Sequence, residues 1–191
     1  MAKAAKAVQT SAERRPKLAG RSLKAGNVTL TPAEPAARLA LRAPQASIAA
    51  LSKALGVTLP QTPKSSAVSK DGARTALWLG PDEWLIVAPD GTDLAGEAAG
   101  AGALHAAVDI AHRNAAILVE GAGAQACLAA GCPQDLSPAA FPVGAVSRTV
   151  FGKAEIVLVR TGEDAFRVEV WRSFADYAWT LLAEAARDAG Q

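Results

Sequence analysis

A hairpin pattern that occurs twice limits the folds open to this chain. In residues 74–91, RTALWLGPDEWLIVAPDG, two apolar runs flank the tripeptide Gly-Pro-Asp at 80–82. Proline fixes φ and aspartate can bond its own backbone, so this tripeptide favours a tight turn between two strands. Trp78 and Trp84 flank the turn and are expected to pair across the strands. Residues 153–172 repeat the pattern, with Thr-Gly-Glu-Asp between two alternating apolar runs.

A strand and a helix precede each hairpin. RLALRAPQASIAALSKALG precedes the first hairpin, and AAILVEGAGAQACLAAG precedes the second. In the first of these segments Ile48, Leu51 and Leu55 share one face of a predicted helix. Gly56 is expected to end that helix. The sequence therefore predicts two βαββα-like halves, at about 36–106 and 107–189, related by a pseudo-two-fold axis. Mostly antiparallel strands with helices packed on the sheet make this an α+β fold.

Two further helices and a break between strands complete the expected order. Residues 92–106 predict a short helix that its glycines weaken. Residues 106–120 predict one long strand, or two strands broken near His112-Arg113. The C-terminal run SFADYAWTLLAEAARDAG has the clearest helical pattern in the chain. Its expected apolar stripe consists of Phe174, Tyr177, Ala178, Leu181, Leu182 and Ala185.

The N-terminal residues 1–27 differ from the rest in composition. They are mainly alanine, lysine, arginine and serine with few large apolar side chains, so burial cannot offset the entropy of ordering them. We expect a flexible arm here, either disordered or ordered across a partner, with RRPKLAG around Leu18 as the anchor. Residues 28–191 are expected to form a single α+β domain.

Charge and hydropathy exclude several classes of partner. The formal net charge of +2 is too small to favour nucleic acid or an anionic membrane. No apolar run approaches the roughly 20 residues of a membrane-spanning helix, and the N-terminus has no secretory pattern. We therefore expect a cytoplasmic location.

Residues 108–136 gather the residue types from which chemistry is usually built. Cys127 is expected on a helix and Cys132 just past its end, so their Cα atoms are too far apart for an unstrained disulfide. Cys127 is interpreted as a small buried apolar residue. Neither cysteine has the partners of a nucleophile, and His105 and His112 do not give zinc-ligand spacing. The sequence predicts no metal site.

The remaining candidates in this stretch are equally weak. Asp109 and His112 are three residues apart and point to opposite faces of a strand, which makes a poor acid–base dyad. GAGA at 121–124 lacks the spacing of a phosphate-binding loop. We expect no catalytic and no cofactor-binding residue.

Six ordered motifs within residues 74–182 carry a resemblance to a known family. They are GPDEWL, VD–HR, GCPQDL, FPVG, the GK that opens a strand, and RSFADYAW. Together they resemble the gamma subunit of bacterial heterotetrameric sarcosine oxidase, which is related in fold to the folate-binding aminomethyltransferase domain.

The resemblance implies a structural subunit that packs against a larger alpha subunit, beside beta and delta subunits. Such a complex demethylates sarcosine to glycine, passing the one-carbon unit to tetrahydrofolate and electrons to oxygen. It implies FAD, FMN, NAD, tetrahydrofolate and zinc on the other subunits and none on this chain. Related N-methylglutamate dehydrogenases use a similar small subunit, which leaves the substrate open.

Tryptophan and arginine often anchor interfaces, which selects the candidate contacts with a partner. These are Trp84, His112, Arg113, Trp171 and Arg172. The alternative to a structural subunit is a stand-alone folate-binding protein, with Asp109 as the carboxylate that would hold the pterin.

Overall fold

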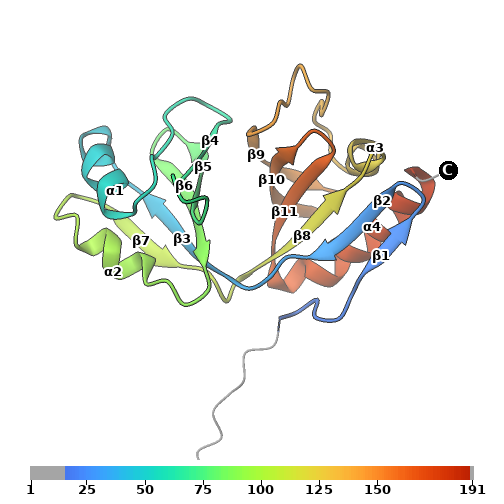
Figure 1. Ribbon diagram of the computed structural model, residues 1–191, viewed down its shortest axis with the longest axis horizontal. Helices are drawn as coiled ribbons and strands as arrows, with labels where there is room; N and C mark the ends of the chain where they lie inside the picture. The colour runs from blue at the N-terminus through green and yellow to red at the C-terminus, as the bar shows by residue number, and fades with distance from the viewer. Residues whose placement is uncertain (1–15, 190–191) are drawn as a thin grey trace, which may run out of the picture.

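The computed structural model describes residues 16–189, which form two antiparallel sheets side by side (Figure 1). The first sheet has the strand order β4-β5-β6-β3-β7. Its strands are β4 (Ser66–Val68), β5 (Thr75–Gly80), β6 (Glu83–Pro89), β3 (Ala36–Arg42) and β7 (Ala106–Asp109). The second sheet has the order β9-β10-β11-β8-β2-β1. Its strands are β9 (Val146–Phe151), β10 (Ala154–Gly162), β11 (Ala165–Trp171), β8 (Asn114–Glu120), β2 (Val28–Pro32) and β1 (Leu23–Ala25).

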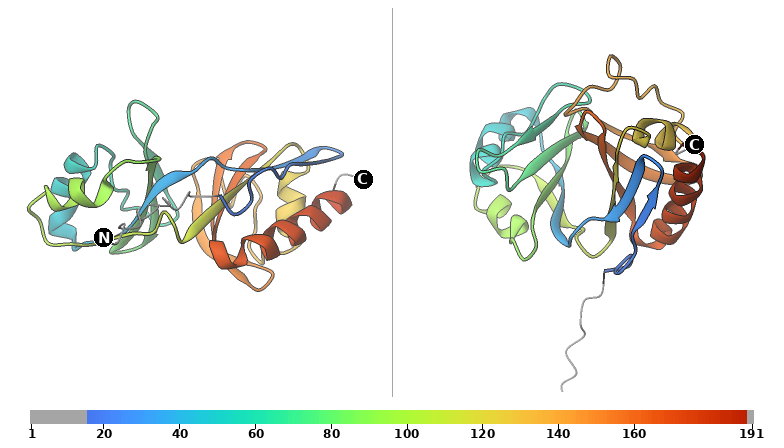
Figure 2. Two further views of the ribbon diagram at one scale, coloured as in Figure 1. Left: turned by 90° about the horizontal axis from the view of Figure 1, so that it is seen from below. Right: turned by 45° about the vertical axis from the view of Figure 1, so that its right-hand side comes forward.

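Each sheet carries its helices on the side that faces away from the other half (Figures 1 and 2). The first half has α1 (Ile48–Ala54) and α2 (Leu94–Ala99), and the second has α3 (Ala124–Ala129) and α4 (Ala175–Ala189). Short 3-10 turns, η1 (Gln45–Ser47) and η2 (Arg172–Phe174), lead into α1 and α4. The predicted α+β fold with antiparallel strands is confirmed.

Both predicted hairpins are present, as β5–β6 and β10–β11, and Trp78 is paired with Trp84 as expected. The central strands are buried on both faces. On β6, Trp84 and Ile86 pack toward α1 and α2, whereas Leu85 lies in a separate cluster with Val146 and Val159 of the second sheet. Because successive side chains on a strand point to opposite faces, one face of each sheet forms a core under its pair of helices. The other face forms a smaller apolar contact between the two sheets.

The two halves share one strand order, but the chain is divided between them differently from the prediction. The strand beside β3 is β7, which spans the expected boundary at 106/107. The strand in the corresponding place beside β8 is β2, which precedes the first half in sequence. The chain therefore crosses between the sheets twice, at 33–35 and again at 110–113.

The expectation of a flexible arm up to residue 27 is wrong for residues 16–27. Leu18 is 3% exposed within the core of the second half. β1 forms an antiparallel pair with β2, with Leu23 opposite Leu30. Backbone pairing and burial of one leucine hold this segment in place, although its composition alone does not favour order. Residues 1–15 lie outside the described residues.

Two helix predictions need correction. α2 ends at Ala99 because Gly100 and Gly102 interrupt it, so it is shorter than the expected 92–106. On α4, Ala178 and Leu182 are buried as predicted, but Phe174 and Tyr177 are 41% and 39% exposed. The helix starts one residue after Phe174, and its buried face includes Trp179 and Ala186 instead.

Candidate partner-binding surface

Four of the five candidate interface residues lie together where the chain passes between the sheets. β8 and β11 are antiparallel, with Trp171 opposite Asn114, so the beginning of one strand lies beside the end of the other. The Arg172 N–H donates to the Arg113 carbonyl oxygen at 2.6 Å and fixes the two loops to each other. The result is an open hollow, which we call the junction surface. It is lined by Lys17, His112, Arg113, Trp171, Arg172 and Ser173.

Arg113 and Trp171 form the centre of the junction surface. The Arg113 Cζ lies 4.8 Å from the centroid of the Trp171 ring, within the range of a cation–π contact. Trp171 remains 40% exposed although it is large and apolar. An exposed tryptophan held in place by a stacked arginine is a typical anchor for protein contacts.

Two more exposed aromatic residues follow Trp171 at intervals of three, Phe174 and Tyr177. The Tyr177 hydroxyl accepts a hydrogen bond from the Lys153 backbone N–H at 3.1 Å, so its ring has a fixed place. The spacing through η2 into α4 brings these side chains to one side of the chain. They extend the apolar part of the surface beyond the hollow.

The N-terminal segment brings a further cation to this place. Lys17 Nζ lies 2.8 Å and Arg21 Nη2 lies 2.6 Å from the two carboxylate oxygens of Asp176 on α4. Lys17, and with it Arg21, holds the pKa of Asp176 below its usual value. Two cations share one carboxylate, so the segment leaves positive charge at the rim of the junction surface.

A second groove adjoins the junction surface and shares Lys17 and Arg172 with it. The two crossings between the sheets form its walls, and most of its lining is proline and alanine. The apolar lining residues are Pro16, Leu18, Pro32, Ala33, Pro35, Ala111, Ala115 and Ala116.

Trp84 does not belong to this surface. It is fully buried in the core of the first half, and its Nε1–H donates to the Pro60 carbonyl oxygen at 2.7 Å. Its proposed role as an interface anchor is therefore wrong. Trp84 lies on the face of β6 shared with Ile86 and Ala88, a pattern that predicts burial.

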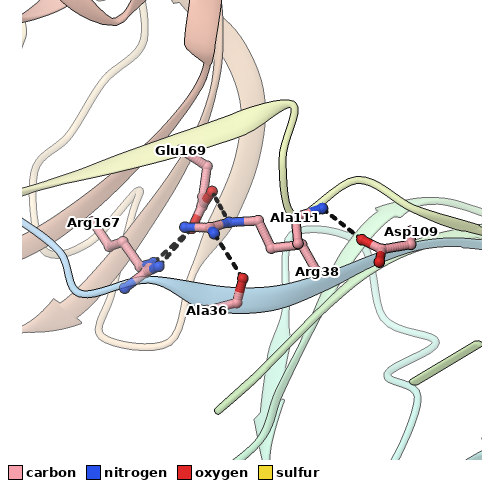
Figure 3. Close-up of polar contacts among 6 residues, drawn as sticks. All are labelled: Ala36, Arg38, Asp109, Ala111, Arg167 and Glu169. Carbon is pink, nitrogen blue, oxygen red and sulfur yellow. Dashed lines mark hydrogen bonds and ion pairs between the residues drawn. The ribbon is translucent and has the colours of Figure 1, made fainter. Parts of the chain in front are cut away.

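Asp109 forms a turn at the second crossing. It is exposed at the end of β7, and its Oδ1 accepts a hydrogen bond from the Ala111 N–H at 2.8 Å (Figure 3). A carboxylate that bonds its own backbone two residues on stabilises a local bend. Among residues 16–189, no group of three or more His, Cys, Asp or Glu side chains could hold a metal ion.

The two cysteines are buried and unbonded to each other. Burial raises the pKa of the Cys127 thiol to about 12, so it stays protonated at neutral pH. Its Sγ lies 3.6 Å from the Leu182 carbonyl oxygen, between α3 and α4. As predicted, Cys127 packs as a small apolar residue. Ala126 and Ala130, near it in the sequence, are exposed.

The glycines at 121 and 123 serve close packing. Gly121 has φ of +107°, and a Cβ there would lie 2.1 Å from the Asn27 carbonyl oxygen. A Cβ on Gly123 would also collide with Asn27. The β1–β2 turn therefore approaches the backbone at a distance that only glycine permits.

The sequence patterns did not reveal an ion network between the sheets. Arg38 on β3 donates to Glu169 on β11, through Nε at 2.7 Å and Nη2 at 3.2 Å (Figure 3). Arg167 donates to the same carboxylate at 2.7 and 2.9 Å. The side chains of Arg38 and Glu169 are 3% and 0% exposed. The sequence signal that could have predicted this network is the presence of charged residues inside two otherwise apolar strands, Arg38 in ARLALR and Glu169 in AFRVEVW.

The same family pattern is found by comparison with known proteins. A family model described as "Sarcosine oxidase, gamma subunit family" matches residues 40–188. The chain belongs to this family. It is 38% identical over 148 residues to a sarcosine oxidase subunit gamma of an Arthrobacter species, covering 75% of this chain and 72% of that one. Identity to the subunit gamma of Corynebacterium sp. strain P-1 is 34% over 165 residues, covering 84% and 81%.

Solved structures agree with the family assignment. A chain of heterotetrameric sarcosine oxidase from Corynebacterium sp. U-96 superimposes with a TM-score of 0.84 at 29% identity, covering 93% of this chain and 97% of that one. Aminomethyltransferase T of the Bartonella henselae glycine cleavage system gives 0.63 at 15% identity, covering 86% of this chain and 50% of that one, and shows a shared fold. Both resemblances inferred from the sequence motifs are confirmed.

Proposed function

We propose that this chain is the small structural subunit of a heterotetrameric sarcosine oxidase and binds the large subunit through the junction surface. The observation that supports this most strongly is the match along 93% of the chain to a structure named as a heterotetrameric sarcosine oxidase. The exposed Trp171 stacked under Arg113 supports the location of the contact. His112 and Arg172 complete the proposed contact set.

The assembly, in this proposal, oxidatively demethylates sarcosine to glycine. FAD, FMN, NAD, tetrahydrofolate and zinc are bound by the other subunits, and this chain contributes shape and contacts. The two free thiols are consistent with a reducing, cytoplasmic location. No helix within residues 16–189 is long and apolar enough to cross a membrane.

The alternatives receive less support. A stand-alone folate-binding protein would use the Asp109 carboxylate to hold the pterin, whereas this carboxylate is exposed and already accepts a hydrogen bond from the Ala111 N–H. An N-methylglutamate dehydrogenase subunit has the same expected shape. Sarcosine is favoured because the curated relatives, at 34–38% identity, are sarcosine oxidase subunits.

Expression of the tagged chain alone and with the other three subunits tests the proposal. The chain alone should show no flavin absorbance and no turnover, and should show no saturable micromolar binding of tetrahydrofolate. The co-expressed chain should recover a flavoprotein that consumes oxygen with sarcosine, and faster than with N-methylglutamate. Recovery of a monodisperse chain without any flavoprotein would contradict the proposal, and folate binding abolished by Asp109→Ala would support the stand-alone alternative.

A further inference from the structure

We propose that the junction surface and the groove beside it hold an acidic segment of the large subunit that also inserts an apolar side chain. This inference rests on the proposed function, because it names the chemistry of the partner at the same surface. It is carried by the charge of the hollow, the geometry of Arg113 and the apolar lining of the groove.

The charge of the hollow calls for an acidic occupant. Its lining contains Arg113, His112, Arg172 and the Lys17 that is ion-paired with Asp176, and no carboxylate. Within residues 16–189, no carboxylate lies within ion-pair distance of Arg113. The positive charge at the centre of the hollow is therefore that of Arg113, since Lys17 is paired with Asp176. An acidic partner would neutralise this charge and be steered toward it.

Stacking on Trp171 gives Arg113 a defined orientation. A guanidinium that lies flat on an aromatic ring keeps its N–H groups directed outward in its own plane. Those groups match the two oxygens of a carboxylate, which makes Asp or Glu the complementary side chain. The tryptophan at the same time offers apolar area to the rest of the segment.

The adjoining groove adds the requirement for an apolar side chain. Proline and alanine from both crossings form most of its lining, beside Glu34 and Arg38, so the carboxylate of the segment belongs at Arg113 and its apolar side chain in the groove. The groove is continuous with the hollow through Lys17 and Arg172. Asn114 lies in its lining, and the Asn114 Oδ1 is buried without a hydrogen-bond partner among the described residues. Buried polar atoms are rarely left without a partner. The apolar lining of the groove therefore suits an apolar side chain, and the Asn114 Oδ1 is closed to solvent.

A second copy of this chain does not complement this surface. Two copies meeting here would bring like charges together, which disfavours the contact. The large subunit is therefore the occupant to which the charge points.

Photo-crosslinking within the assembled complex identifies the occupant. A photo-reactive amino acid is placed at Trp171, with Val68, which is 61% exposed on the first sheet, as the matched position. The crosslink from position 171 should map to a large-subunit peptide that contains Asp or Glu and an apolar residue, and position 68 should not reach that peptide. A peptide without a carboxylate, a second copy of this chain, or no crosslink from 171 in an intact complex would overturn the inference.

Charge reversal tests the same point without a probe. The double variant Arg113→Glu/Arg172→Glu should weaken binding to the other subunits about tenfold or more, and the loss should shrink as salt screens the contact. Arg113→Lys/Arg172→Lys should bind more tightly than the reversal, and Lys53→Glu/Lys70→Glu on the exposed surface of the first half should match the unaltered chain. Circular dichroism checks that every variant is folded.

These outcomes separate the two proposals. If the unaltered chain binds no other subunit, the proposed function fails and this inference fails with it. If the unaltered chain binds and the charge reversal binds equally well, the proposed function stands and the acidic segment is rejected.

Discussion

The two halves of the molecule share one strand order but differ at the outer edge of the sheet and in the length of their helices. In the first half the sheet ends at β7, and its helices have seven and six residues. In the second half β1 covers the outer edge of β2, and α4 has fifteen residues. The basic residues and exposed aromatics of the junction surface lie where this second half meets the crossings. One repeated unit thus ends at its own sheet edge, while the other, extended by the N-terminal segment, carries the surface that we propose as the contact with the partner.

Two tryptophans on equivalent hairpins test that contrast with the largest expected effect. Trp84→Ala removes a fully buried ring and should lower the free energy of unfolding by about 3–5 kcal/mol. Trp171→Ala should lower it by about 1 kcal/mol or less, because its ring is 40% exposed, and should weaken subunit binding instead. Guanidinium unfolding followed by circular dichroism measures both, and equal losses of stability would contradict the assignment of core and surface.

The buried ion network between the halves is expected to have the next largest effect on stability. Glu169→Gln keeps the side-chain volume but leaves Arg38 buried without its charge partner, which should cost about 3 kcal/mol. The control is Glu83→Gln, whose ion pairs to Arg42 and Arg148 are more exposed and should contribute about 1 kcal/mol or less. Similar costs for the two variants would show that the sheets do not depend on the buried pair.

The N-terminal segment distinguishes the halves most clearly, and Leu18 tests its contribution. Leu18→Ala should lower the free energy of unfolding by about 2–3 kcal/mol, since the side chain is 3% exposed in the core. Leu104→Ala, at a leucine of the first half that is 77% exposed, should change it by about 0.5 kcal/mol or less. A negligible effect of Leu18→Ala, in urea unfolding, would show that the segment is not part of the folded second half.

The smallest expected effect concerns pH at the same segment. The pKa of Asp176 is lowered in the folded protein by Lys17 and Arg21, so its stabilising contribution is present above its ordinary pKa and is lost as pH falls through the lowered value. Amide exchange of Leu23–Ala25, corrected for intrinsic rates, should therefore quicken in acid relative to neutral pH. Asp176→Asn should give the faster exchange at both pH values. If amide exchange of Leu23–Ala25 were unchanged in this variant, the ion pairs of Asp176 would not be what holds the N-terminal segment in place.

Local patterns predicted what depends on neighbouring residues. The Gly-Pro-Asp turn, the pairing of Trp78 with Trp84 and the helix ended by Gly56 all follow from a few adjacent side chains. The assignment of β7 and β2 to their sheets did not follow, because either strand could have paired at either edge. Short apolar strands do not encode their distant partners.

The candidate site was predicted only in part for the same reason. His112, Arg113, Trp171 and Arg172 were identified by residue type, but a register between β8 and β11 brings them together. Lys17 was missed as a lining residue because its place depends on Asp176, far away in the sequence. Trp84 was misassigned although its alternation with Ile86 already indicated a buried face.

Hydrogen–deuterium exchange of this chain, free and within the four-subunit complex, tests the central claim most directly. The account predicts that assembly slows exchange at residues 112–116 and 171–177 of the second half. It predicts no change at the β5–β6 turn, residues 80–82, or around Val68 in the first half. Protection confined to the first half, with residues 112–116 and 171–177 unchanged, would contradict it.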